Sequence, residues 1–139
     1  MFLGSSKGGY SALNFSFLIP NVTVVIGSPQ YYIGSYLDTQ GTLDNLCFII
    51  GEITEEGKEE LNNRLRNRIQ TSEILPKLVY FHYSNAEHTY QDHVKDMLRD
   101  LRERGIPIIE DIQSYEKHSG LKDFYPPFLT ESVNKIFEQ

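Results

Sequence analysis

The sequence contains a single cysteine, no tryptophan and few basic residues. Its 139 residues include 13 Lys and Arg against 19 Asp and Glu, which gives a formal net charge of −6. One cysteine cannot form an internal disulfide framework, and the apolar run at residues 46–50 predicts that Cys47 is a buried, unreactive thiol. The shortage of clustered Lys and Arg argues against nucleic acid as a partner, because binding to phosphates requires such clusters.

The sequence also has no apolar run near the roughly 20 residues that span a bilayer, and no basic N-terminal region followed by an apolar stretch. Neither a membrane span nor a secretory signal is expected. Glycine first appears at Gly4 and not at position 2, so myristoylation is not expected either. These absences, together with the lone cysteine, predict a cytoplasmic protein. The length suits a single domain over residues 1–139.

The remaining pattern alternates between strand and helix. Short apolar runs predict strands at residues 1–4, 22–26, 77–83 and 106–112, the last being an edge strand because of Pro107. Amphipathic or capped segments predict helices at residues 10–19, 55–70, 89–104 and 126–137. Residues 30–72 contain no convincing strand and read as a helical excursion, with a short helix at 42–50. The fold class is therefore α/β, with a parallel sheet, flanking helices and right-handed crossovers.

One motif carries specific chemistry. Gly4-Ser5-Ser6-Lys7-Gly8 matches G-x-S-x-G, the strand-to-helix turn that exposes a nucleophilic serine. We expect Ser6 to be the nucleophile and the backbone N–H of Lys7 to bind the oxyanion, with Gly8 on the same side of the site. A small-residue turn without chemistry is the alternative. A phosphate-binding P-loop is disfavoured, because its pattern ends in G-K-[ST], whereas here Lys7 comes before Gly8 and Gly9.

A serine needs a base, and the base needs an acid that orients it. In hydrolases of this type the chain order is serine, acid, histidine, and each residue follows a strand of the sheet. His118 follows the last predicted strand and is the expected base. Glu87 follows the strand at 77–83 and is the expected acid. Asn85 carries no charge, and Asp92 is expected to face solvent.

Two further sets of side chains lie near these positions. His82, His88 and His93 match no metal-ligand spacing, and on a continuous helix the last two point about 140° apart, so no metal is expected. Tyr31 and Tyr32, after the second strand, either form the wall of a substrate pocket or belong to the core.

Together these segments carry a family resemblance. FLGSSKGGYSALNF is similar to the nucleophile turn and following helix of serine α/β-hydrolases. The set GSSKGG, GSPQYYIGSYL, LNNRL, EHTYQDH, YEKHSG and FYPPFL resembles capsular polysaccharide biosynthesis proteins of the XcbB/CpsF type. Accessory Sec system acetyltransferase-like proteins resemble it more distantly.

The resemblance implies Ser6 as nucleophile, His118 as base and Glu87 as acid. It also implies a small-molecule or glycan acyl substrate in cell-surface polysaccharide biosynthesis, without a cofactor. Two alternatives remain open. One is a non-catalytic scaffold or binding subunit that keeps the hydrolase shape. The other is a small Rossmann-like binding domain, which the absence of G-x-G-x-x-G disfavours.

The sequence departs from the family pattern at its start. Serine α/β-hydrolases have further strands before the nucleophile turn, and a loop among them supplies a second oxyanion donor. Here the first predicted strand leads directly into that turn. We therefore expect an N-terminally incomplete hydrolase domain whose first strand is an exposed edge, prone to pairing with a second copy. We also expect a weakened oxyanion hole.

Overall fold

The computed structural model describes residues 1–138 of the chain. Its centre is a parallel four-stranded sheet in which the strands follow one another in chain order, β1-β2-β3-β4. The strands are β1 (Phe2–Ser5), β2 (Thr23–Gly27), β3 (Leu78–Ser84) and β4 (Ile108–Gln113). The α/β fold class is thus confirmed, and β1 and β4 are the two edges of the sheet.

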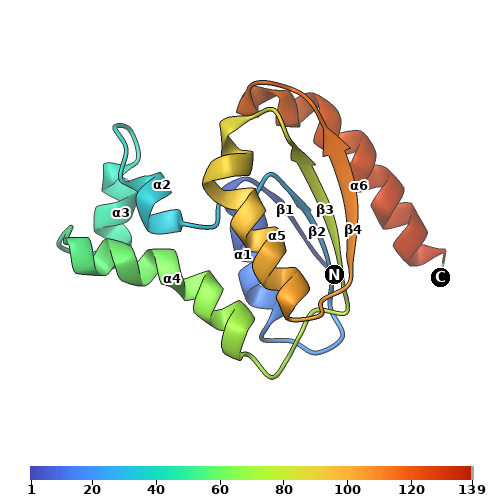
Figure 1. Ribbon diagram of the computed structural model, residues 1–139, viewed down its shortest axis with the longest axis horizontal. Coiled ribbons are helices and arrows are strands. Elements are labelled where there is room, and N and C mark those ends of the chain that lie inside the picture. Colours follow the sequence, from blue (N-terminus) through green and yellow to red (C-terminus); the bar gives the residue numbers. More distant parts are fainter. Residues whose placement is uncertain (139) are drawn as a thin grey trace.

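Helices cover both faces of the sheet, as Figure 1 shows. α1 and α5 lie on one face and α6 lies on the other. The helices are α1 (Lys7–Ser16), α2 (Ile33–Leu37), α3 (Leu43–Ile50), α4 (Glu55–Thr71), α5 (Lys95–Glu103) and α6 (Leu121–Phe137). A parallel pair needs a crossover connection, and when strands are added in order all right-handed crossovers fall on the same face.

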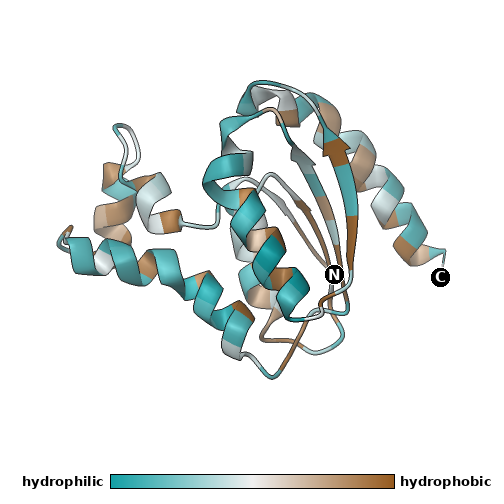
Figure 2. Cartoon of the chain, in the orientation of Figure 1, coloured by the Kyte–Doolittle hydropathy of each residue, from teal (hydrophilic) through white to brown (hydrophobic). Residues whose placement is uncertain are grey.

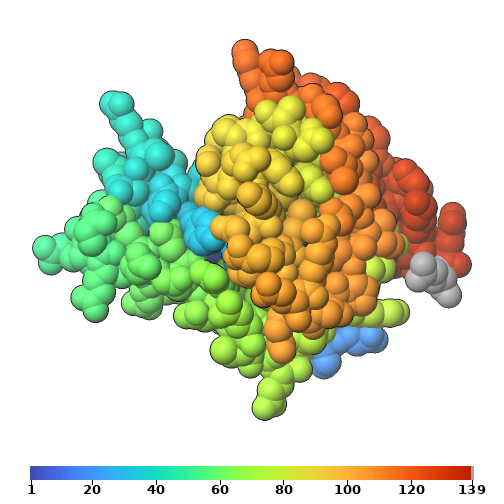
Figure 3. Space-filling model, in the orientation of Figure 1, coloured from blue at the N-terminus to red at the C-terminus, as the bar shows by residue number. Residues whose placement is uncertain are grey.

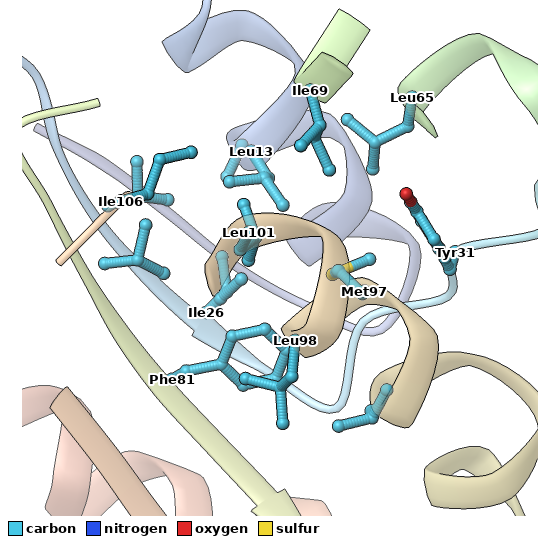
Figure 4. Close-up of a cluster of buried hydrophobic side chains, with 14 of the residues drawn as sticks. Leu13, Ile26, Tyr31, Leu65, Ile69, Phe81, Met97, Leu98, Leu101 and Ile106 are labelled. Carbon is cyan, nitrogen blue, oxygen red and sulfur yellow. The ribbon is translucent and has the colours of Figure 1, made fainter. Parts of the chain in front are cut away.

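Alternate residues of the strands supply two apolar cores. On one face, Ile26 and Phe81 pack with Leu13 of α1 and with Met97 and Leu101 of α5 (Figure 4). On the other face, a smaller cluster joins Val25 and Tyr80 to Leu121 and Tyr125 of α6. Because side chains alternate across a strand, neighbouring residues in β2 and β3 serve opposite cores.

Helices α2, α3 and α4 form a lobe beside the sheet domain, next to α5 (Figures 1 and 3). The lobe has its own small cluster, made by Ile33, Leu37, Leu46 and Leu61. Only apolar residues at four-residue spacing in α4 are buried, and the rest of the helix is hydrophilic (Figure 2). No described helix is long and apolar enough to cross a bilayer.

The predicted burial of Cys47 is wrong. In α3 only Leu46 is buried, so a continuous apolar run presents most of its side chains outward. The Cys47 thiol is exposed and donates to the carbonyl of Gly51 over 3.0 Å. An apolar run is buried on all sides only when the helix is covered on all sides, and α3 is covered on one.

α1 spans Lys7–Ser16 and not the predicted residues 10–19. Two more helices differ from their predicted extents. α6 starts at Leu121 and runs through Pro126 and Pro127, whereas the prolines were expected to open it. Leu121 and Tyr125, one turn apart, anchor the early part on the sheet. The carbonyls of residues 122 and 123, four residues before the prolines, lie on exposed residues, where water can replace the lost N–H donors.

The second difference lies in the predicted helix at residues 89–104. A π-helical turn, Tyr90–Val94, precedes α5, and the N–H of Lys95 bonds to the carbonyl of Tyr90. Such turns hold one more residue than an α-helical turn and often mark functional sites. Apolar periodicity alone does not reveal this extra residue.

Candidate active site

The turn between β1 and α1 holds Ser6 in a strained conformation. Its φ is 54° and its ψ is −124°, which places a non-glycine residue in the left-handed half of backbone space. The Ser6 N–H donates to the carbonyl of Gly27 over 2.8 Å, and its own carbonyl accepts from Gly9 and Tyr10 in the first turn of α1. These bonds hold the side chain at the carboxyl edge of the sheet.

Glycine at position 4 is what allows this turn. A Cβ there would collide with the backbone carbonyl of Gly8 and lie 2.8 Å from the Gly9 nitrogen. The Tyr125 hydroxyl donates to the Gly4 carbonyl over 3.1 Å and so ties the turn to α6. At Gly8, by contrast, an added Cβ meets nothing within 4 Å. Only the first glycine of the motif is demanded by the packing of the fold.

Ser6, His118 and Glu87 come together although 112 residues separate the first two. The Ser6 Oγ lies 3.1 Å from Nε2 of His118, and Nδ1 of the same ring lies 3.0 Å from Oε1 of Glu87. His118 opens a short 3-10 turn before α6, and Glu87 immediately precedes the helix that contains the π-turn. Distances of this size are those of a nucleophile, its base and an orienting acid.

The electrostatics of Glu87 suit an orienting acid. Its side chain is only 1% exposed, whereas that of His118 is 31% exposed. Burial is the largest influence on the Glu87 carboxyl and acts to raise its pKa. Hydrogen bonds from His118 and Thr89, with the charge on His118, outweigh burial and bring the pKa of Glu87 below its usual value. An ionised Glu87 accepts the Nδ1–H of His118 and leaves Nε2 free to accept a proton from Ser6.

The other predicted site residues fall in two places. Lys7 and Gly8 are exposed in the first turn of α1, whose leading N–H groups have no intrahelical partner. The side chain of Lys7 lines a hollow of about 290 Å³ together with Arg64 of α4 and apolar residues of the lobe. Tyr31 lies in the core, where its hydroxyl donates to Asp100 over 2.7 Å and its side chain is fully buried (Figure 4).

Tyr32 instead lines a second hollow of about 520 Å³. We call this the Tyr32–His88 hollow, and its wall consists of Tyr32, Ser35, Tyr36, Thr39, His88, Asp92 and His93. The ring of His88 lies 6.5 Å from that of His118, which brings the hollow beside the base. Neither hollow includes Ser6, His118 or Glu87 among its wall residues.

The π-turn explains how His88 and His93 share this wall. Five residues apart, they would diverge on a regular α-helix, but five residues is close to one full turn where hydrogen bonds span i to i+5. His93 Nδ1 accepts the N–H of Tyr32 over 3.2 Å, which joins the π-turn to the segment before α2. Within residues 1–138 no group of three or more His, Cys, Asp or Glu side chains is arranged to hold a metal ion.

The buried side chain of His93 is expected to make the stability of the fold sensitive to acid. Burial, with only 8% of the residue exposed, is the main reason that its pKa falls from 6.5 to about 4. Between pH 6.5 and pH 4 the unfolded chain binds a proton at His93 that the folded chain does not bind. The stability that neutral His93 contributes is therefore fully present above about pH 6.5 and is lost as the pH falls to 4. We expect a loss of about 2–3 kcal/mol over this window.

Chemical denaturation at a series of pH values measures this effect. His93→Gln keeps an acceptor for the Tyr32 N–H and should flatten the dependence between pH 6.5 and 4. His88→Gln is the matched control, because His88 is an exposed histidine on the same wall. It should keep most of the slope, since the charge on His88 adds less to the lowered pKa of His93 than burial does. An unaltered slope in His93→Gln would contradict the assignment.

A second, partly buried chain of hydrogen bonds is not apparent from the sequence. Asp111 Oδ2 lies 2.6 Å from Nδ1 of His82, and Nε2 of His82 lies 3.2 Å from the Tyr115 hydroxyl. That hydroxyl lies 3.1 Å from Ser28 Oγ, and burial raises the pKa of Tyr115 to about 12, which keeps it neutral. Gly27, His82 and Asp111 are register partners on neighbouring strands. Polar residues inside apolar strands were the available signal, but linking them requires the register.

Comparisons with solved structures show which known proteins share this fold. Capsule O-acetyltransferase of Neisseria meningitidis serogroup A matches with a TM-score of 0.75 at 19% identity, over 92% of this chain and 54% of that one. Fluorophosphonate-binding serine hydrolase F of Staphylococcus aureus matches with a TM-score of 0.63 at 17% identity, over 81% of this chain and 45% of that one. The chain has an α/β-hydrolase-like fold.

The comparison of sequences is less specific. No family model matches. Conserved virulence factor C of Staphylococcus saprophyticus is 27% identical over 121 residues, which cover 68% of this chain and 32% of that protein. The chain thus spans about a third of this curated relative and about half of the solved O-acetyltransferase. The likeness to the capsule O-acetyltransferase and to the serine hydrolase confirms the predicted hydrolase-like fold, and at these identities it shows the fold alone.

Proposed function

We propose that this chain carries the catalytic residues of a serine acyltransferase or esterase that acts on ester-linked acyl groups of capsular or cell-surface polysaccharide. The observation that carries the proposal is the continuous contact from Ser6 through His118 to Glu87, with distances of 3.1 and 3.0 Å. The fold shared with a capsule O-acetyltransferase and with a serine hydrolase supports the choice of acyl chemistry.

The proposed reaction has two halves. Ser6 Oγ attacks the acyl carbonyl and its proton passes to Nε2 of His118, while the backbone N–H of Lys7 binds the oxyanion. Collapse of this intermediate expels the leaving group, which takes the proton from His118, and leaves an acyl ester on Ser6. An acceptor hydroxyl then gives its proton to His118 and attacks the ester. When this second intermediate collapses, the acyl group leaves with the acceptor and His118 returns the proton to Ser6 Oγ, which restores the free serine. With water as acceptor the enzyme is an esterase, and with a sugar hydroxyl it is a transferase.

The hollows suggest where substrates bind. The Tyr32–His88 hollow lies on the side of the base, and its aromatic and polar wall suits a polyhydroxylated acceptor. Lys7 and Gly8 begin α1 directly after the nucleophile and would contact the acyl donor, and Lys7 also lines the hollow of about 290 Å³. Tyr31 would act indirectly, since its bond to Asp100 anchors the segment that carries Tyr32.

The test uses two acyl donors. One structure of the meningococcal enzyme contains CoA, so acetyl-CoA with unacetylated capsular polysaccharide tests transfer, and O-acetylated polysaccharide tests hydrolysis. We expect acetate to be moved or released by the wild-type chain and not by Ser6→Ala. A folded chain inactive toward both would favour the alternative, a non-catalytic scaffold or binding subunit of a glycan-assembly complex.

Two expectations about the setting stay proposals. β1 is bonded to one strand only, so two copies can pair through this edge, and light scattering that shows a clean monomer would reject this. The cytoplasmic location expected from the composition is tested by cell fractionation.

A further inference from the structure

Gln30 contacts the nucleophile and has no part in the reaction described so far. It lies in the loop after β2, is only 1% exposed, and places Oε1 3.1 Å from the Ser6 Oγ. Its amide nitrogen donates no hydrogen bond to a described residue, and it is not among the fully buried side-chain atoms that lack a partner, so it keeps some contact with solvent.

The proton of Ser6 cannot serve both of its neighbours. Glu87 holds the Nδ1–H of His118, so Nε2 of that ring is an acceptor and takes the Ser6 proton. The carbonyl oxygen of Gln30 would then face the lone pairs of the Ser6 oxygen. A half-turn of the amide about its last bond exchanges its oxygen and nitrogen with little other movement. In that orientation the NH₂ group donates to Ser6 Oγ, and all three groups are compatible.

The loop holds Gln30 firmly in this position. Before it, Ser28 has a φ of 36° and its N–H donates to the carbonyl of His82 over 2.8 Å. Gly9 of α1 leaves room for Pro29, because a Cβ on Gly9 would lie 3.0 Å from Pro29 Cβ. After Gln30, Tyr31 is tied to Asp100. A donor held in place before the reaction stabilises developing charge without a cost of reorganisation.

We propose that the side-chain NH₂ of Gln30 is a second oxyanion donor, which acts with the backbone N–H of Lys7 on the negative oxygen formed after attack by Ser6. The proposal rests on the proposed function, since it requires Ser6 to be the nucleophile. Side-chain amides fill this role in other acyl-transfer enzymes. Here the amide comes from the loop that follows β2, next to the nucleophile turn, and it lies in one site with Ser6, Lys7, Glu87 and His118.

The experiment compares rates of labelling by a fluorophosphonate and of p-nitrophenyl acetate hydrolysis. Gln30→Glu preserves shape, loses the donors and adds a negative charge, and Gln30→Met removes the donors without adding charge. Both should slow labelling by about 10²- to 10³-fold and lower kcat with KM unchanged. Gln70→Glu, the same change on an exposed residue of α4, should behave as wild type.

A second readout does not depend on whether a variant folds. In the wild-type chain, labelling of Ser6 should shift the side-chain amide protons of Gln30 downfield in an ¹⁵N-resolved NMR spectrum and leave those of Gln70 in place. If wild type is labelled but the Gln30 amide does not respond and both variants react at the wild-type rate, the role of Gln30 is overturned and the proposed function stands. If folded wild type takes no label, both proposals fail together.

Discussion

Ser6→Ala is expected to abolish covalent labelling by a fluorophosphonate and to reduce acyl turnover by about 10⁵- to 10⁶-fold, the loss seen when a serine nucleophile is removed from an intact site. His118→Ala should cost nearly as much, because the hydroxyl then has no base within 3.1 Å. Members of such a set act as a unit, so the double variant should be scarcely worse than either single one. The mass of the intact protein after a fixed exposure to the fluorophosphonate measures covalent labelling of the two single variants and of the double variant.

Glu87→Gln separates orientation from charge. A neutral amide of the same shape keeps the contact to His118 Nδ1 but can favour the wrong imidazole tautomer, and a comparable substitution elsewhere lowered kcat by roughly 10⁴-fold. Because the pKa of Glu87 lies below its usual value, the carboxylate is ionised at neutral pH and its orienting effect is lost only in acid.

The matched controls lie close by. Ser5→Ala removes the neighbouring serine in the same motif, and His88→Ala removes an exposed histidine whose ring lies 6.5 Å from that of His118. Both variants should be labelled at the wild-type rate. An adduct that persists in Ser6→Ala, or that disappears in Ser5→Ala, would contradict the identity of the nucleophile.

The largest effect on stability is expected for Gly4→Ala. The new methyl group would overlap the backbone of Gly8 and Gly9, which cannot move without displacing the start of α1. We expect the free energy of unfolding to fall by about 3 kcal/mol or more. Thermal melting and urea titration measure it directly, and labelling of Ser6 should fail in whatever fraction remains folded, because the turn is displaced.

Gly8→Ala is the control from the same motif. An added Cβ at this position meets nothing within 4 Å, and the backbone is helical. Alanine is a better helix former than glycine, so this variant should be neutral or more stable by up to about 1 kcal/mol. If Gly4→Ala and Gly8→Ala destabilised the chain equally, the close contact between β1 and α1 at Gly4 would not be the reason that glycine is required there.

The parts of the site that the sequence predicts are those encoded locally. The turn at Ser6 is recognisable from five consecutive residues. The predicted strand ends then place His118 and Glu87 at the same edge of a parallel sheet. Gln30 has no such signal. It becomes visible only once β1 and β2 lie side by side and their following loops meet.

The remaining errors share a physical cause, namely coverage by other elements. Cys47 was expected to be buried from its apolar neighbours, yet α3 is covered on one side only. α6 begins before its prolines because Leu121 and Tyr125 find apolar partners in β2 and β3. Periodicity states that a face is apolar but does not state which surface it will meet.

The π-turn depends on the number of residues in the helix and not only on which residues they are. It amounts to a helix that has gained one residue, so deleting a single residue between His88 and Lys95 would restore regular helical winding and swing one wall of the Tyr32–His88 hollow away from the other. In an alignment of relatives of this chain, we therefore expect a one-residue gap at this place to mark chains in which the hollow has a different shape.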